Sequence, residues 1–332
     1  MPVRFISPSL GGSSGPLRAH EWEISVAYRR LTADQWCVGT AVREASAPFG
    51  TPLFLDIDSL DVSTTYGVSN RISLTLTLPF SRGTHSRFYA DGNRHKVKAL
   101  GLGDISLFSN IWLRKPAEHP GGNVAVGVGL KTPSGDNGVI DDFFLADGSV
   151  TRSPVDQSIQ LGDGGFGIIL QAQAFRRLSH RLSGYVYGWY LLTPRDRTGA
   201  PSPLPGAPLS VPDVYSIRPG LTYAVRSKEG VSVSLGTRTD GIPVHDIVGG
   251  SDGFRRPGYT LYLDPGLAFA RGGGIWTVNV PLRLHLELQK EYGRPPEGHV
   301  WGRRLGEIPD PCRLYLAILI ANGSELSKKG SF

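Results

Sequence analysis

Three ionisable side chains alternate near the end of the chain, where Arg283, His285 and Glu287 occupy every second position. A histidine beside a carboxylate can transfer protons, and it activates a serine hydroxyl that lies within reach. In an extended strand, alternate residues share one face. The same three residues therefore also fit an ion-paired wall or a polar constriction that selects permeants. The choice depends on the strand that carries them and on what each face contacts.

That strand has a continuous apolar face. In segment 276–289, WTVNVPLRLHLELQ, the apolar residues alternate with polar ones, and Pro281 interrupts the polar face. Segment 70–80, NRISLTLTLPF, alternates in the same way, with Ser73, Thr75 and Thr77 opposite its leucines. About twelve segments follow this pattern, which predicts β-strands with one apolar and one polar face.

The connections between these segments alternate in length. Short connections are expected at 67–70, 115–122, 176–180, 226–230 and 271–274, and long ones at 32–56, 81–101, 133–164, 194–212, 239–257 and 288–311. A soluble β-sandwich gives no reason for this alternation, whereas outer-membrane barrels have short periplasmic turns and long external loops. Most segments span about 9–13 residues, the length of a tilted transmembrane strand.

Composition narrows the function classes. The chain has 332 residues, of which 40% are hydrophobic and 19% charged, with 43 glycines and 25 prolines that favour turns over helices. The net charge of +6 accompanies no basic helix, so we expect no nucleic-acid partner. The eight histidines and two cysteines show no metal-binding spacing, and GDGGFG at 162–167 fails the dinucleotide pattern. We therefore predict no metal and no cofactor.

Several motifs resemble a known family. They are YGVSNRISLTLTLPF at 66–80, GLGDISLF at 101–108, VAVGVGLKTPSGD at 124–136, RPGY at 256–259 and the two PGL segments at 219–221 and 265–267. Together they resemble the outer-membrane transporter barrels of the phenol-degradation meta-pathway family, over roughly residues 60–285. The resemblance implies a barrel associated with passage of hydrophobic or aromatic compounds, and it carries over no catalytic residues.

We therefore predict an all-β fold, a closed antiparallel transmembrane β-barrel of about twelve strands. Residues 1–20 would form a periplasmic segment that is flexible or plugs the barrel, 21–322 the barrel, and 323–332 a polar tail. The expected location is the outer membrane of a Gram-negative bacterium, with a signal peptide already removed from the sequence.

The lumen face supplies the candidate site. We expect polar residues on several strands to line it and to contact permeants, and a hairpin through 271–274 would place Tyr262 near Arg283. An internal salt-bridge network that fills the barrel is the structural alternative. Cys37 and Cys312 would meet near the seam between the first and last strands, which makes a disulfide a hypothesis. The lumen-lining candidates are Arg283, His285, Glu287, Tyr262, Asp264, Arg218, Arg238 and Arg313.

Three functions fit this reading. The first is passive passage of small molecules, hydrophobic or aromatic ones among them, through a polar lumen. The second is a structural or partner-binding barrel with a filled lumen, plugged by the N-terminal segment or by loop 133–164. The third, an outer-membrane lipid hydrolase, needs an outward histidine, and the alternation directs His285 inward, so we predict that the protein is not an enzyme. The expected partners are outer-membrane lipids and a small permeant, with lipopolysaccharide attracted to the basic loop 81–101.

Overall fold

The computed structural model describes residues 16–34, 36–38, 40–43, 53–202, 208–226, 230–271, 274–288 and 318–323. The regular structure in this part of the chain is β-strand, apart from one short 3-10 helix, η1 (Pro116–Glu118). No helix in these ranges is long and apolar enough to span a bilayer. The strands are β1 (Trp22–Ala33), β2 (Trp36–Val38), β3 (Ala41–Arg43), β4 (Leu53–Gly67), β5 (Ile72–Phe88), β6 (Arg94–Leu102), β7 (Ser106–Trp112), β8 (Gly122–Lys131), β9 (Ile140–Phe144), β10 (Val150–Pro154), β11 (Gly167–Arg177), β12 (Leu182–Leu192), β13 (Val214–Arg226), β14 (Val231–Ile242), β15 (Gly258–Arg271), β16 (Gly274–Asn279), β17 (Leu282–Leu288) and β18 (Ile318–Gly323).

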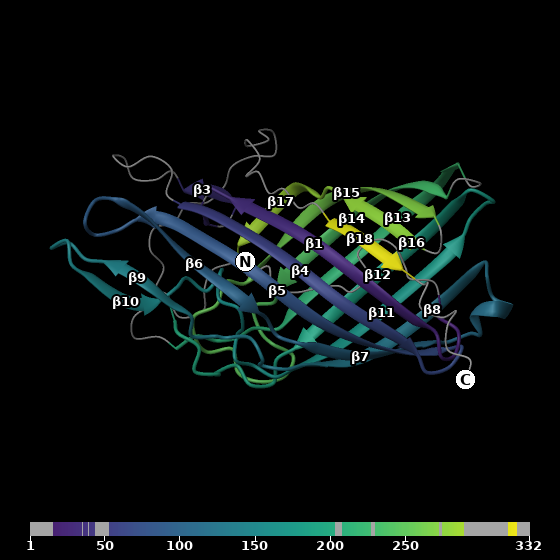
Figure 1. Cartoon of the computed structure of the whole chain (residues 1–332), viewed down its shortest axis with the longest axis horizontal. Helices are drawn as coiled ribbons and strands as arrows, with labels where there is room; N and C mark the ends of the chain where they lie inside the picture. Colours follow the sequence, from purple (N-terminus) through teal and green to yellow (C-terminus); the bar gives the residue numbers. More distant parts are fainter. Residues whose placement is uncertain are drawn as a thin grey trace.

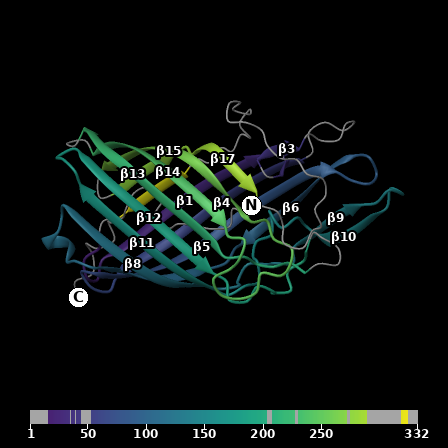
Figure 2. The ribbon, with the colours of Figure 1, turned by 180° about the vertical axis from the view of Figure 1, so that it is seen from behind.

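One large curled antiparallel sheet contains most of these strands (Figure 1). Its order begins β1-β4-β5-β7-β8-β11-β12-β13-β14, and β14 then pairs with β15. On the other side, β1 pairs with β18, β18 with β16, and β16 with β15. β6 pairs with the far half of β5, and β9–β10 and β2–β3 form separate two-stranded sheets. The strands run obliquely to the long axis, as Figure 2 shows from behind.

The two ends of the sheet differ in the length of their connections. At the short-turn end, β4–β5, β7–β8, β11–β12, β13–β14 and β15–β16 are joined through 68–71, 113–121, 178–181, 227–230 and 272–273. At the long-loop end, the connections include 132–166, 193–213 and 243–257. The β9–β10 hairpin projects there beside the β5–β6 hairpin, at the left of Figure 1. Among the described connections, the predicted alternation of short and long lengths is confirmed. The expected loop 81–101 is instead mostly a β-hairpin, because β5 runs on to Phe88 and β6 pairs with it, and 289–311 lies outside the described residues.

The two faces of the sheet follow the sequence alternation. On β5, Leu76 is 41% exposed, whereas Thr77 is fully buried. Hydroxyl groups of β4 and β5 meet on the buried face, where Ser63 Oγ lies 2.8 Å from Thr77 Oγ1 and Thr65 Oγ1 lies 2.9 Å from Thr75 Oγ1. We call the concave, polar side the inner face and the apolar side the outer face. The predicted orientation of 70–80 is confirmed.

The strand expected at 276–289 is broken in two. β16 pairs with β15 as far as Asn279, and β17 pairs with β15 from Leu282 onward, with Val280 and Pro281 between them. Proline has no amide hydrogen to donate, so the ladder stops there. The buried side chain of Pro281 fills the interruption on the inner face.

Candidate functional site

Two ion pairs lie on the inner face at the middle of β13, β14 and β15. Arg218 Nε donates to Asp264 Oδ2, and these side chains are 2% and 0% exposed. Arg238 Nη2 lies 2.9 Å from Asp240 Oδ2, and its guanidinium sits 4.7 Å from the centre of the Tyr262 ring. Four of the predicted lumen residues, Arg218, Arg238, Tyr262 and Asp264, are therefore brought together in one buried cluster.

Several polar atoms of this cluster have no hydrogen-bond partner among the described residues. Both Nη1 and Nη2 of Arg218, and Oδ1 of Asp264, lack hydrogen-bond partners in the part of the chain that the structure describes. A buried polar group without a partner costs free energy, and the cost is larger for a charged group. The cluster is therefore less stable dry than it would be in contact with water or a polar solute.

Two glycines on this wall make room for an aromatic side chain. A Cβ atom on Gly220 would lie 2.4 Å from Tyr185 Oη, and one on Gly236 would lie 2.9 Å from the same atom. The Tyr185 side chain thus occupies the room that both glycines provide. The glycines allow aromatic packing across β12, β13 and β14.

A second inner ion pair lies on β1 and β4. Arg29 Nη2 is 2.8 Å from Asp61 Oδ2, with side-chain exposures of 6% and 2%. We did not predict this pair as functional, although strand alternation places both residues inward and consecutive long strands of such a sheet pair with each other. Testing charged inward residues across neighbouring strands would have found it.

The prediction that β17 directs its charged residues to the inner face is correct at Arg283 and wrong at His285 and Glu287. Arg283 opposes Tyr262, as expected, but His285 opposes Leu261. Leu284 is therefore an extra residue, a β-bulge, and it reverses the alternation that follows. His285 and Glu287 now share the face of Leu261 and Tyr259 rather than the inner face.

The outward His285 forms a small polar cluster at the long-loop end. Its Nε2 lies 3.8 Å from Glu287 Oε2, it is 43% exposed, and its ring centre is 5.7 Å from that of Tyr259. The argument that no outward histidine exists is therefore wrong. On the β15 side, however, the register partners of His285 and Glu287 are Leu261 and Tyr259, and neither is a serine that the histidine would activate.

The remaining predicted residues cannot be placed. Arg313 and Cys312 lie outside the described residues, and of Cys37 only the backbone, in β2, is described. The disulfide hypothesis and the role of Arg313 therefore stay predictions, as do a periplasmic or plugging role for residues 1–20 and a polar tail at 323–332.

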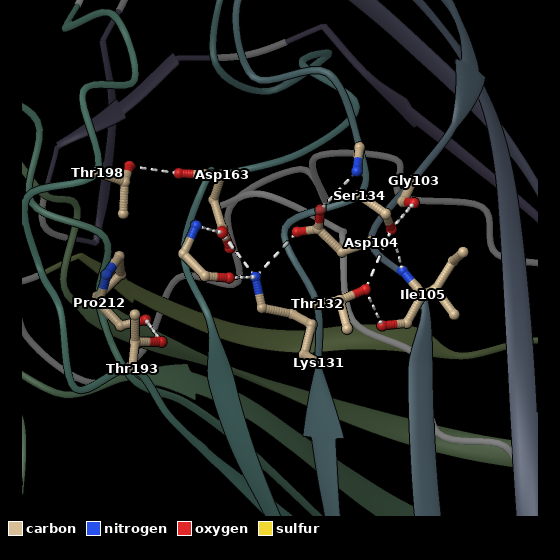
Figure 3. Close-up of polar contacts among 12 residues, drawn as sticks. Gly103, Asp104, Ile105, Lys131, Thr132, Ser134, Asp163, Thr193, Thr198 and Pro212 are labelled. Carbon is tan, nitrogen blue, oxygen red and sulfur yellow. Dashed lines mark hydrogen bonds and ion pairs between the residues drawn. The ribbon is translucent and has the colours of Figure 1, made fainter.

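A buried lysine fixes the loop that follows β10 (Figure 3). Lys131 Nζ, at the end of β8, donates to Asp104 Oδ2 at 2.9 Å, to Asp163 Oδ1 at 2.6 Å and to the Gly165 carbonyl at 2.7 Å. Burial, and then the neighbouring Asp163 carboxylate, raise the pKa of Asp104 above its usual range. The lysine thus ties three separate segments together at the long-loop end.

Beyond this anchor, the loop turns against the inner face. Ile159 packs over Gly83, where a Cβ atom would lie 2.6 Å from the isoleucine Cβ. Val155, Ile159 and Leu161 join one hydrophobic cluster with inward residues of β1, β4 and β6. Part of loop 133–164 therefore covers the inner face at the long-loop end, while the plugging of the lumen by this loop stays a prediction.

The outer face is apolar across many strands. Aliphatic and aromatic side chains alternate with inward residues on each strand and remain exposed, which is unusual for a surface in contact with water. Members of this outer belt include Trp22, Ile24, Leu60, Leu74, Leu76, Phe80, Leu107, Ile111, Val126, Val128, Leu170, Val186, Ile217, Leu221, Leu235, Leu267, Val278 and Leu282.

Aromatic residues border the belt at the long-loop end. One row of successive register partners crosses five strands, β12 to β15 and β17, and contains Tyr190, Tyr215, Gly241, Tyr259 and Glu287. The rings of Tyr190 and Tyr215 are stacked with centres 6.4 Å apart. A row of tyrosines at the edge of an apolar band matches the interfacial position such rings prefer in membranes.

Comparison with solved structures identifies the fold. An outer-membrane channel from Pseudomonas putida F1 superposes with a TM-score of 0.60 and 13% sequence identity, over 95% of this chain and 99% of that one. The chain has the fold of an outer-membrane channel. The Ralstonia pickettii toluene transporter TbuX is less similar, with a TM-score of 0.44 and 10% identity over 94% of this chain and 92% of that one. The translocator domain of autotransporter NalP from Neisseria meningitidis has a TM-score of 0.45 and 10% identity over 92% and 88%. No family model and no curated protein matches the sequence.

Proposed function

We propose that the chain is a closed twelve-stranded barrel in a bacterial outer membrane and a passive channel for small molecules, apolar and aromatic ones included. The strand pairings support closure, because they lead from β1 through β14 and β15 to β16, β18 and back to β1. Among the described strands, counting β16 and β17 as one interrupted strand and β6 as an extension of β5 gives twelve around the ring.

The observation that carries the membrane assignment is the inversion of polarity between the two faces. Hydroxyl and charged side chains are buried inside, while the outer belt is exposed and apolar. In water this arrangement would promote aggregation, whereas in a bilayer each side chain of the belt contacts lipid. The short-turn end would face the periplasm and the long-loop end the exterior.

The channel itself rests on the unsatisfied cluster around Arg218 and Asp264. The guanidinium of Arg218 and the carboxylate of Asp264 gain hydrogen bonds when the constriction opens and admits water or a polar solute. These hydrogen bonds offset part of the free-energy cost of opening. A constriction of this kind selects permeants by size and polarity.

A filled barrel with a structural or partner-binding role is the second candidate. The near-complete burial of inner side chains such as Arg29, Asp61 and Arg218 favours it, as does the packing of Ile159 over Gly83.

Single-channel recording in planar bilayers separates the two functions. The purified chain should conduct, and the double variant Arg218→Ala/Asp264→Ala should increase the conductance because it removes the constriction. The matched control Arg152→Ala/Asp142→Ala deletes an exposed ion pair of 3.2 Å in the β9–β10 hairpin and should leave the conductance unchanged. Absence of current, together with absence of solute uptake by liposomes, would leave the filled barrel as the better description.

A further inference from the structure

A pocket opens inside the mouth of the sheet at the long-loop end. It lies where segments 157–163 and 209–214 and the residues 254–256 meet the ends of β13 and β14, and it encloses about 620 Å³ including space open to solvent. We call it the mouth pocket. Its apolar part is formed by Leu209, Val211, Val214, Ile242 and Phe254. A predominantly apolar lining with a few polar groups is typical of small-molecule sites.

The walls of the mouth pocket are held by buried charges. Arg255 Nη1 and Nη2 donate to the two carboxylate oxygens of Asp246, each at 2.9 Å, and Nη2 also contacts Ser210 Oγ. Asp213 accepts hydrogen bonds from the Thr193 and Ile247 amides at 2.7 and 3.0 Å. Segment 209–214 is thereby cross-linked to Arg255, Asp246 and Ile247, so the apolar surface that Leu209, Val211 and Phe254 form is present before any ligand arrives.

One cation on the rim is available to a ligand. Of the polar groups that line the pocket, Asp163 is bound by Lys131 and Arg255 by Asp246. Arg256 makes no ion pair among the described residues; its guanidinium lies 5.4 Å from the centre of the Phe254 ring and within electrostatic range of Asp156. That carboxylate is already hydrogen-bonded to the Ser158 amide and hydroxyl at 2.9 and 2.7 Å.

We propose that the mouth pocket binds small apolar rings that carry one carboxylate, with the ring against Val211, Val214 and Phe254 and the carboxylate on Arg256. A guanidinium binds a carboxylate through two parallel hydrogen bonds, and an aromatic surface beside it suits a flat ring. This inference rests on the proposed channel function for its role, as the site where a permeant is first captured, but binding itself does not require conduction.

Binding to the detergent-solubilised full chain tests the proposal, with benzoate as the anionic probe and toluene as the neutral one. Titration calorimetry should give a benzoate affinity that falls at least about tenfold in Arg256→Gln, the loss expected when a charged hydrogen-bonded contact is removed. Toluene binding should change little in that variant. Val214→Trp fills the pocket and should abolish binding of both probes.

Two control variants lie on the projecting β9–β10 hairpin. Arg152→Gln removes an exposed arginine, and Val150→Trp adds the same ring at a residue that is 53% exposed. Both should bind the probes as the wild type does. Benzoate binding that survives Arg256→Gln unchanged overturns the role of this arginine, and equal binding in Val214→Trp overturns the pocket. Binding of the probes without conductance would contradict the channel function and support the binding site. Conductance without binding would support the channel function and contradict the binding site.

Discussion

At the scale of single residues, hydroxyl pairs bind neighbouring strands on the inner face. Thr77 is fully buried, and its Oγ1 lies 2.8 Å from Ser63 Oγ. Thr77→Val keeps the shape but leaves the serine hydroxyl without this partner, so the free energy of unfolding should fall by about 1–3 kcal/mol. Urea unfolding in phospholipid vesicles, followed by tryptophan fluorescence, measures the change.

The double variant Ser63→Ala/Thr77→Val provides the control for this pair. Because it removes both hydroxyls, its loss should be smaller than the sum of the two single losses. Strictly additive losses would show that the two hydroxyls do not interact and would contradict the pairing.

A second residue-scale prediction concerns pH. Burial lowers the pKa of His85 below its usual 6.5; Arg87 and Arg256 lower it further, and Asp156 opposes them. The neutral ring is therefore favoured when loop 155–161 is packed in the mouth. When the loop is displaced, His85 binds a proton more readily, so packing is stable above about pH 6.5 and weakens as the pH falls toward the lowered pKa.

Hydrogen exchange at residues 155–161, corrected for intrinsic rates, should therefore increase between about pH 7.5 and about pH 5.5. His85→Gln cannot take up the proton and should abolish this increase. Equal pH dependence in the variant and the wild type would assign the effect to other groups.

At the scale of elements, the Leu284 bulge decides what β17 presents to each face. Deleting Leu284 makes Arg283 and His285 consecutive, and they can still oppose Tyr262 and Leu261 in a regular ladder. The deletion should therefore fold. Deleting Leu76 from the regular strand β5 should prevent folding, because every later side chain of that strand moves to the opposite face. The mobility of unboiled samples on denaturing gels reports the folded fraction; equal fractions in the two deletions would contradict the bulge.

The same bulge marks the limit of the sequence analysis. Alternation correctly predicts the faces of β4 and β5 and the pairing of Tyr262 with Arg283, since period two holds wherever the ladder is regular. It fails at His285 and Glu287, because a bulge inserts one residue without a distinctive residue type at Leu284. The break between β16 and β17, by contrast, had a visible signal in Pro281.

Contacts between distant loops were also beyond sequence reasoning. Lys131 lies at the end of β8, but its partners Asp104 and Asp163 come from separate connections at the long-loop end. Neither hydrophobic periodicity nor charge spacing relates such segments, because their meeting depends on the order of strands around the sheet. The mouth pocket is hidden for the same reason, since its walls come from three loops.

At the scale of the whole molecule, the outer belt requires an apolar environment, whereas the part of β5 and β6 that extends beyond it requires water. On β5 the exposed apolar residues end at Phe80, while the strand continues to Phe88 and pairs there with β6. The β6 surface combines exposed Lys96, Lys98 and Leu100. A bilayer that covers the belt would leave this extension in water, where the basic residues would face anionic lipid headgroups.

This division predicts different costs for the same substitution at two exposed leucines. Leu76 lies at the centre of the β5 belt, and Leu100 lies on the extension with 75% of its surface exposed. Leu76→Arg should lower the free energy of unfolding from phospholipid vesicles by about 2–4 kcal/mol, because a guanidinium near the bilayer midplane loses its hydration. Leu100→Arg should change it by less than about 0.5 kcal/mol, as expected for a surface in water. Both values come from urea titrations of vesicle-bound protein, and equal small costs at the two positions would place Leu76 in water and remove the basis for a membrane-embedded barrel.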